Sequence, residues 1–172
     1  MLLRLPALLA LTTLIPLILA LPSPKQPWYE RYHHPIVRVP QSYYEALQLR
    51  RQTPLNPHAA RDIACADRNS HILFHDEHAA TLAICGGLAG GTAASATTTC
   101  DGSAGETEGR SGTALFTLRA VESGAGVKIS KEEWVACVRA AREACPRGSV
   151  EGVCVGGATR GDVRFSLRAV AV

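Results

Sequence analysis

Two ten-residue segments in the C-terminal half of the chain share one pattern of alternating apolar and polar positions. Residues 112–121 read GTALFTLRAV and residues 161–170 read GDVRFSLRAV, so six of the ten positions are identical. Alternation of this kind is typical of a strand that buries one face. A repeated segment indicates that the chain is built from two similar halves.

The first half places a short apolar segment and a helix before its copy of the repeat. Residues 72–74 (ILF) are the expected strand, and Asp76 is the expected N-cap of a helix. That helix is expected to end at Cys85, because two glycines follow it. The stretch from 83 to 112, rich in Gly, Ala, Ser and Thr, is expected to be a long loop pinned by Cys100.

The second half repeats this order. Residues 127–129 (VKI) are the expected strand, and Ser130 with Glu133 three positions later forms a capping box. The helix is expected to run through Cys145, because Pro146 stops it. One apolar face at helical spacing contains Trp134, Val138, Ala141 and Cys145.

These elements give β-α-β twice. Right-handed crossovers lay both helices on one face of the sheet. The connection 121–127 is short and glycine-rich, as suits a hairpin between adjacent antiparallel strands. We therefore expect an α+β, ferredoxin-like β-α-β-β-α-β two-layer sandwich with a four-stranded antiparallel sheet, stabilised by disulfides, with its core at about residues 60–172.

Residues 1–20 have the build of a secretory signal peptide that ends at Ala20. Arg4 precedes about fifteen apolar residues. A membrane anchor is the alternative, but Pro6 and Pro16 interrupt the stretch, which falls short of the ~20 apolar residues of a spanning helix. The sequence therefore predicts a secreted, extracellular protein without a stable membrane anchor.

Residues 21–51 are the expected propeptide. The segment is rich in proline and contains no cysteine. Ser42 and Glu45 have the spacing of a capping box that would open a short helix through the dibasic pair Arg50–Arg51. We expect cleavage after this pair, which leaves a mature domain of residues 52–172. The alternative is that the two arginines only favour the helix C-terminus, where the dipole attracts cations.

Charge is divided unevenly between these regions. Six of the eighteen basic residues but only two of the fifteen acidic ones precede residue 52, so the remainder carries a net charge of −1. A nearly neutral body is a poor match to nucleic-acid binding that is driven by phosphate contacts. Composition thus argues against nucleic acid as a partner and against a large enzyme.

Six cysteines lie in the last 108 residues. An even number in a short secreted domain predicts three disulfides among fifteen possible pairings. The absence of Cys-x-x-Cys argues against a metal framework. Cys137 and Cys145 lie on one expected helix about 12 Å apart, beyond the ~4.4–6.8 Å that a disulfide spans, and so bond elsewhere. The cysteines are Cys65, Cys85, Cys100, Cys137, Cys145 and Cys154.

This sequence of features resembles a known group of proteins. A signal peptide, a prosegment ending in Arg50–Arg51 and a cysteine-stapled β-α-β-β-α-β body are similar to the virally encoded killer toxins of smut fungi, of the killer protein six type, and to small secreted fungal effectors of that fold. The resemblance lies in architecture and processing. It implies a non-enzymatic effector or toxin that binds an extracellular, host or competitor target, and it carries over no catalytic residue.

The histidines supply the alternative chemistry. His71, His75 and His78 stand beside Asp76 and Glu77, a set of residue types that binds zinc or copper. Structural use on a strand-to-helix turn is the simpler interpretation, and we expect no cofactor.

A small secreted hydrolase is the second alternative. A ribonuclease-like site needs a base, an acid and arginines for the phosphate, which His71, His75, Glu77, Arg119 and Arg168 supply by type. A solvated sheet face is the simpler interpretation of the two arginines. We therefore expect a monomer that binds an unknown extracellular or host target, with enzymatic activity the less favoured outcome.

Overall fold

The computed structural model describes residues 39–87 and 99–171, which form a disulfide-stabilised α+β fold. Residues 57–59 and 84–86 form short 3-10 turns. The helices and strands are α2 (Gln41–Gln52), β1 (Ala60–Asp67), α3 (Phe74–Ala83), β2 (Glu106–Ser111), β3 (Ala114–Ala120), α4 (Lys131–Ala144), β4 (Ser149–Gly157) and β5 (Asp162–Ala169).

The two repeated segments are strands, as predicted, and they lie side by side. β3 and β5 pair in antiparallel register, with Phe116 opposite Leu167 and Leu118 opposite Phe165. These four side chains are buried, while Arg119 and Arg168 are exposed on the other face. The alternation in the sequence therefore corresponds to a sheet that has one face in the core and one in solvent.

The sheet has five antiparallel strands in the order β1-β4-β5-β3-β2, where the sequence predicted four in a ferredoxin-like layout. Two of the expected strands are wrong. Residues 72–74 lead into α3, and within 127–129 only Val127 makes a single bridge, to Ala158. The connection 121–127 is therefore not a hairpin between adjacent strands. The strands that join β3 and β5 in the sheet are β1, β2 and β4.

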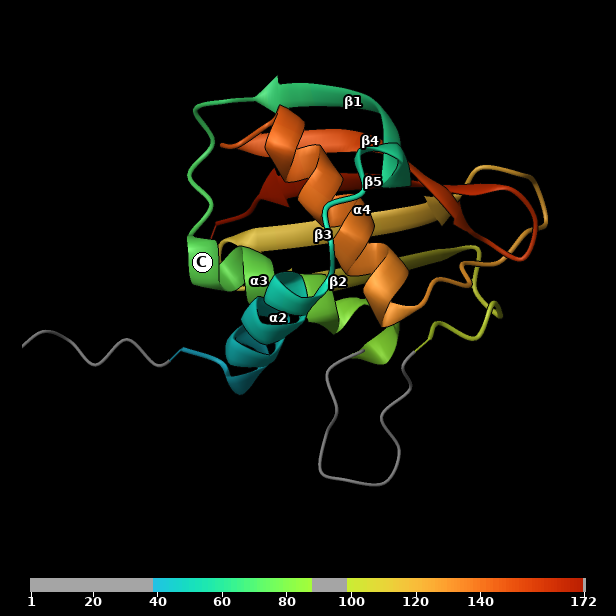
Figure 1. Ribbon diagram of the computed structural model, residues 1–172, viewed down its shortest axis with the longest axis horizontal. Coiled ribbons are helices and arrows are strands. Elements are labelled where there is room, and N and C mark those ends of the chain that lie inside the picture. The colour runs from blue at the N-terminus through green and yellow to red at the C-terminus, as the bar shows by residue number, and fades with distance from the viewer. Residues whose placement is uncertain (1–38, 88–98, 172) are drawn as a thin grey trace, which may run out of the picture. The chain divides into compact units, whose positions relative to one another are not determined.

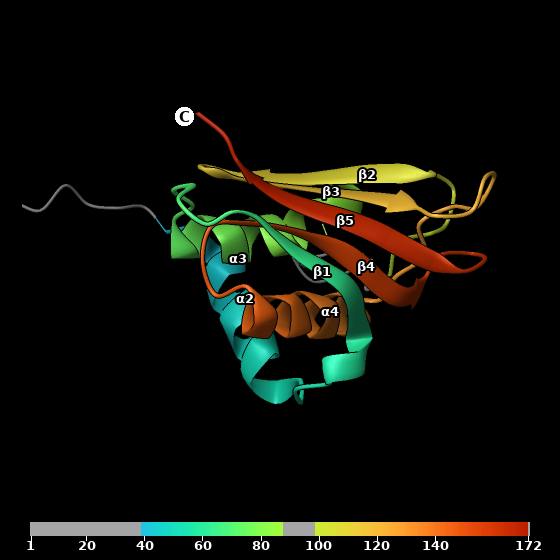
Figure 2. The ribbon, with the colours of Figure 1, turned by 90° about the horizontal axis from the view of Figure 1, so that it is seen from above.

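The helices cover one face of the sheet, as expected, and leave the other open. Figure 1 shows α2, α3 and α4 in front of the strands, and Figure 2 shows them together on the lower side of the sheet. Helix α2, which the sequence placed in the propeptide, lies against α3 and α4. It belongs to the same packed unit, Val39–Val172, as the rest of the domain.

Of three predicted helix starts, only one has the predicted cap. In α4 the Ser130 side chain accepts from the Glu133 amide at 3.2 Å, and the Glu133 carboxylate accepts from the Ser130 amide at 2.9 Å. Helix α3 begins at Phe74 with Leu73 at its N-cap, so Asp76 is not the cap. The Asp76 carboxylate instead accepts from the Thr113 amide and hydroxyl, each at 2.8 Å, and ties the helix to the β2–β3 turn.

The third start, in α2, also differs. Pro40 occupies the N-cap without a side-chain hydrogen bond, and Ser42 lies inside the helix, so the predicted capping box is absent. The helix itself is confirmed, and it ends one residue after the dibasic pair.

Trp134 is the centre of the core. The side chain is fully buried, and its ring packs edge-on against Phe116 and Phe165 at centroid distances of 5.1 and 5.7 Å. Its indole nitrogen donates to the Thr81 carbonyl at 2.7 Å, which joins α4 to α3. The predicted apolar face of the helix is confirmed, because Val138 and the other members of the set are also buried.

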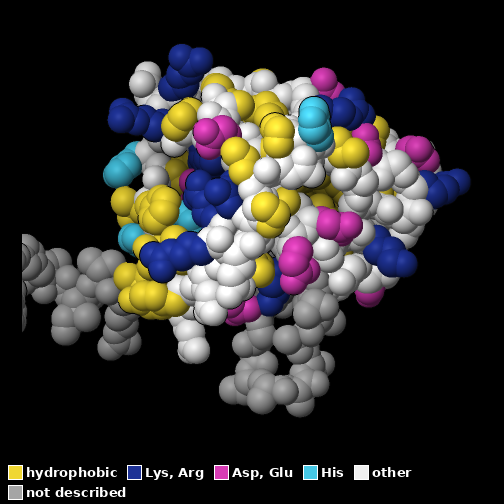
Figure 3. Space-filling view, in the orientation of Figure 1, with side chains coloured by type: hydrophobic (Ala, Val, Ile, Leu, Met, Phe, Trp, Pro, Cys, Tyr) yellow, Lys and Arg dark blue, Asp and Glu magenta, His cyan; other side chains and the backbone are white. Residues whose placement is uncertain are grey.

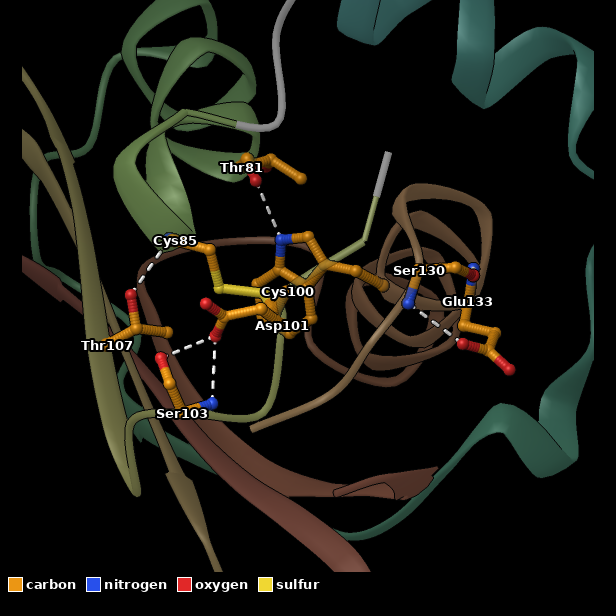
Figure 4. Close-up of a disulfide and its surroundings, with 9 residues drawn as sticks. Thr81, Cys85, Cys100, Asp101, Ser103, Thr107, Ser130 and Glu133 are labelled. Atoms are coloured by element: carbon orange, nitrogen blue, oxygen red, sulfur yellow. Dashed lines mark hydrogen bonds between the residues drawn. A yellow bond between two sulfur atoms is a disulfide. The ribbon is translucent and has the colours of Figure 1, made fainter. Parts of the chain in front are cut away.

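All six cysteines are paired. Cys65 bonds Cys145, Cys85 bonds Cys100 and Cys137 bonds Cys154, so the exclusion of a bond between Cys137 and Cys145 is confirmed. The close-up of Figure 4 shows the Cys85–Cys100 bond, where the Cys85 amide donates to the Thr107 hydroxyl at 2.8 Å. The disulfide joins the end of α3 to the chain before β2. Both ends of this bond lie within residues 83–112, the expected long loop, and so does strand β2.

Candidate functional site

Helix α2 is held on α3 and α4 by an apolar residue and by polar contacts near both ends. Ala46 is 2% exposed, and Leu49 packs against the core. Toward the N-terminus, the Lys131 ammonium of α4 donates to the Glu45 carboxylate at 2.6 Å. Toward the C-terminus, the Arg139 guanidinium of α4 donates to the carbonyl of Arg50 at 3.1 Å, and also to that of Thr53.

His78 of α3 supplies a further contact beneath α2. Its Nδ1 lies 2.8 Å from the Phe74 carbonyl, and its Nε2 lies 3.2 Å from the Arg50 guanidinium. A carbonyl only accepts and a guanidinium only donates, so the geometry requires the neutral imidazole with its proton on Nδ1. Desolvation by burial lowers the pKa of His78, and the charges of Arg50 and Arg142 act in the same direction.

The expected processing residues lie in the last turn of α2. Arg51 is exposed, whereas Arg50 is half-buried through its contact with His78. A protease binds its substrate in an extended form, so this helical turn must unwind before the bond after Arg51 can be cut. The expected signal-cleavage residue, Ala20, and the propeptide up to residue 38 lie outside the described residues.

An aromatic patch marks the junction of α2 and α3. Tyr44 is 61% exposed, Phe74 56% and Leu73 37%, and Tyr43 packs edge-on against both Phe74 and His78. Figure 3 shows hydrophobic and histidine side chains gathered on this side of the helical face. Large exposed aromatic groups are characteristic of protein-binding surfaces.

The three histidines have separate environments. His71 is exposed in the loop before α3, His75 lies 3.2 Å from the Asp76 carboxylate, and His78 is enclosed under α2. Within residues 39–87 and 99–171, no group of three or more His, Cys, Asp or Glu side chains has the geometry to hold a metal. His78 also has both ring nitrogens occupied, so it could ligate a metal only by losing one of those contacts.

The residue types of the ribonuclease-like alternative lie on opposite faces of the sheet. Glu77 and His75 belong to α3 on the covered face, while Arg119 and Arg168 stand on the open one. Arg119 lies directly opposite Arg164 beside a hollow of about 600 Å³, whose lining also includes two glutamates. Arg119 and Arg164 therefore lie in mixed-charge surroundings on the solvated face.

Sequence reasoning missed a buried ion pair between α3 and α4. The Arg142 guanidinium donates to both carboxylate oxygens of Glu77, at 2.7 and 2.8 Å, and to the carbonyls of Cys145 and Gly148 at 3.0 and 2.9 Å. Both residues are less than a tenth exposed. Neither the spacing nor the charge pattern indicated that Glu77 and Arg142 form a pair, because they lie 65 positions apart.

The packing of α2 against the domain could have been predicted from a pattern in the sequence. Tyr43, Ala46 and Leu49 follow one another at intervals of three, as on a buried helix face. The proline-rich surroundings and the dibasic pair instead indicated a propeptide.

Comparison with known proteins yields no relative: no protein-family model, curated protein or solved structure matches this chain. The three disulfides are typical of an oxidising, extracellular environment. None of the helices in the described part of the chain is long and apolar enough to cross a membrane.

Proposed function

We propose that this protein is a secreted, non-enzymatic effector or toxin-like protein that acts by binding, and that α2 covers its binding surface in the precursor. The observation that supports the proposal is that α2 packs against α3 and α4. Every cysteine follows residue 64, so cleavage after Arg51 leaves the segment attached by non-covalent contacts alone.

Release of α2 would uncover an apolar groove between α3 and α4. Val135 and Val138 of α4 and Thr81 of α3 line a small cavity against Ala46 of α2, and the ionisable side chains of Glu77, His78 and Arg139 border it. Lys131 of α4 would lose the Glu45 carboxylate, and Arg139 would lose the carbonyl of Arg50. Freshly exposed apolar area beside unpaired cations is a surface that gains free energy by binding again.

The occupant that fits this groove is an amphipathic helix from the target protein. Helix α2 itself defines the requirements: a small residue where Ala46 packs, and a carboxylate near the N-terminus to meet Lys131. The exposed aromatic patch of Tyr44, Phe74 and Leu73 loses Tyr44 on cleavage and keeps the other two beside the groove. A helix in an apolar groove is a common mode of recognition.

The extracellular setting and the target class follow from the processing. A precursor that is cut in the secretory route releases its binding surface only near or outside the cell. The order of prosegment, dibasic pair and cysteine-stapled α+β body supports the resemblance to fungal killer toxins and effectors. The target is then an extracellular, host or competitor-cell protein.

Mass spectrometry of the secreted product tests the processing. The full chain, expressed in a eukaryotic secretory host, is expected to start at Gln52 and to gain six hydrogen atoms on reduction of its three disulfides. The variant R50A/R51A is expected to retain residues up to 51. A wild-type product that starts near Leu21 would contradict the proposal.

Rebinding of the helix tests the groove. The cleaved protein is mixed with a synthetic peptide of residues 39–51, and binding is followed by fluorescence anisotropy. We expect saturable binding, abolished when the peptide carries Ala46→Arg, because a buried charge without a partner is strongly unfavourable. Equal binding of the two peptides would exclude the groove as the docking site.

A further inference from the structure

Two loops at one end of the domain, residues 67–73 before α3 and residues 145–148 after α4, are locked together. The disulfide Cys65–Cys145 joins their bases, with Cα atoms 5.6 Å apart. Gly148, at φ +71°, approaches the other loop so closely that a Cβ would lie 2.0 Å from the Asp67 carbonyl oxygen. Only glycine fits there, which fixes the spacing of the two backbones.

Hydrogen bonds add to this rigidity. Arg142 donates to the Cys145 and Gly148 carbonyls, and the Ser70 and Ser149 hydroxyls lie 2.7 Å apart. The Asp67 carboxylate accepts from the Asn69 amide at 2.9 Å, within its own loop. The backbones of the two loops are therefore fixed before any ligand arrives, and a preorganised backbone loses less entropy on binding.

Arg68 and Arg147 border both hollows that open between these loops, each about 440 Å³. Both side chains are exposed, and no carboxylate of the described residues lies within 4 Å of either guanidinium. The acidic residue in the lining, Glu77, is already neutralised by Arg142. His71 and Asn69 complete the polar rim, so the lining carries an excess of positive charge.

We propose that this cradle binds a phosphate or sulfate group carried by a small molecule. A guanidinium offers two parallel N–H donors to a tetrahedral oxyanion, and Arg68 and Arg147 border the same hollows from adjoining loops. The side-chain amide of Asn69, which borders both hollows, supplies a neutral donor beside them. The cradle contains no residue of α2, so it is independent of the prosegment and of the function proposed above.

NMR titration of the full secreted chain with inorganic phosphate, and separately with inorganic sulfate, tests the site. Sodium chloride keeps the ionic strength constant, because exposed charges respond to salt. We expect saturable shifts of the amides in residues 67–73 and 145–148 with at least one of the two anions. The anion that binds more tightly indicates which of the two groups the natural ligand carries.

Matched variants locate the binding. R68Q/R147Q is expected to weaken binding at least about tenfold, since charge-assisted hydrogen bonds are lost. The control is R168Q, which removes one exposed arginine from the open sheet face and is expected to leave the affinity unchanged. Equal thermal unfolding of all three proteins establishes that the fold is intact. Absence of saturation, or equal affinity of R68Q/R147Q and R168Q, would overturn the proposal.

Discussion

At the scale of single residues, the pair Glu77–Arg142 joins α3, α4 and the turn into β4. Arg142 is buried, and its guanidinium donates to four acceptor atoms, which compensate its charge. We expect Glu77→Gln to lower the free energy of unfolding by about 3–5 kcal/mol, because the cation is left buried without a counter-charge. Urea unfolding followed by circular dichroism measures this.

A double variant separates the charge from the packing. Glu77→Leu with Arg142→Met removes both charges and keeps apolar volume, so its stability is expected to exceed that of Glu77→Gln. If the double variant were the less stable of the two, the carbonyl contacts of Arg142 would outweigh the pairing of charges.

His78 makes stability depend on pH. Its pKa is lowered in the folded state, mainly by burial, so the unfolded chain takes up the proton more readily. The folded state is therefore favoured fully above pH 6.5 and loses stability as the pH falls below that value. A protonated ring would also carry a hydrogen on Nε2 and face the Arg50, Arg139 and Arg142 cations, with Glu77 as a counter-charge.

The measurement is the melting temperature at pH 7.5 and pH 5.0. We expect the decrease on acidification to be smaller in His78→Gln, which keeps an acceptor for Arg50 and does not titrate. An equal decrease in the two proteins would assign the acid sensitivity to other groups.

At the scale of elements, β2 packs on α3 through a glycine. A Cβ at Gly109 would lie 2.6 Å from the Ala80 carbonyl oxygen and 2.7 Å from the Ile84 nitrogen, both backbone atoms. Gly109→Ala is therefore expected to lower the free energy of unfolding by about 1–3 kcal/mol through overpacking. The control Gly105→Ala, whose Cβ would meet nothing nearer than 3.4 Å, is expected to change it by less than about 0.5 kcal/mol. Chemical denaturation of both variants gives the comparison.

The elements that the sequence predicted are those with a local cause. The strands of the repeat alternate in polarity, and α4 carries both a capping box and a continuous apolar face. β2 has the sequence ETEGRS, without a large apolar residue, and is a strand because its backbone pairs with β3 at the sheet edge. In β1, Asp62 at φ +54° lies where the register of pairing with β4 shifts, which breaks any alternation.

The candidate site was less predictable, because it depends on contacts between distant elements. The spacing of His75 and His78 suggested a shared metal, but helix α2 covers His78 and occupies its Nε2. Arg68 and Arg147 lie 79 positions apart, and tertiary contacts, among them the disulfide and the close approach at Gly148, place their loops side by side. The sequence predicted the helix over Arg50, whereas its packing partners emerged only from the tertiary structure.

At the scale of the whole molecule, the three disulfides differ in the length of chain that they close. Cys65–Cys145 spans 80 positions and ties β1 to the end of α4, whereas Cys85–Cys100 spans 15 and Cys137–Cys154 spans 17. In the loop-entropy description, the longest closure stabilises by about 4.5 kcal/mol and the shortest by about 3 kcal/mol. Removal of Cys65–Cys145 is therefore expected to be the most destabilising.

Paired alanine variants test this order. C65A/C145A is expected to melt below C85A/C100A, and unreduced intact mass establishes that the two remaining disulfides have formed in each. The first variant also releases the bases of the loops that carry Arg68 and Arg147, so phosphate or sulfate binding is expected to weaken there and to persist in C85A/C100A. If both variants bound the anion as the wild type does, Gly148 and the Arg142 hydrogen bonds alone would be holding the loops, and the disulfide would serve stability only.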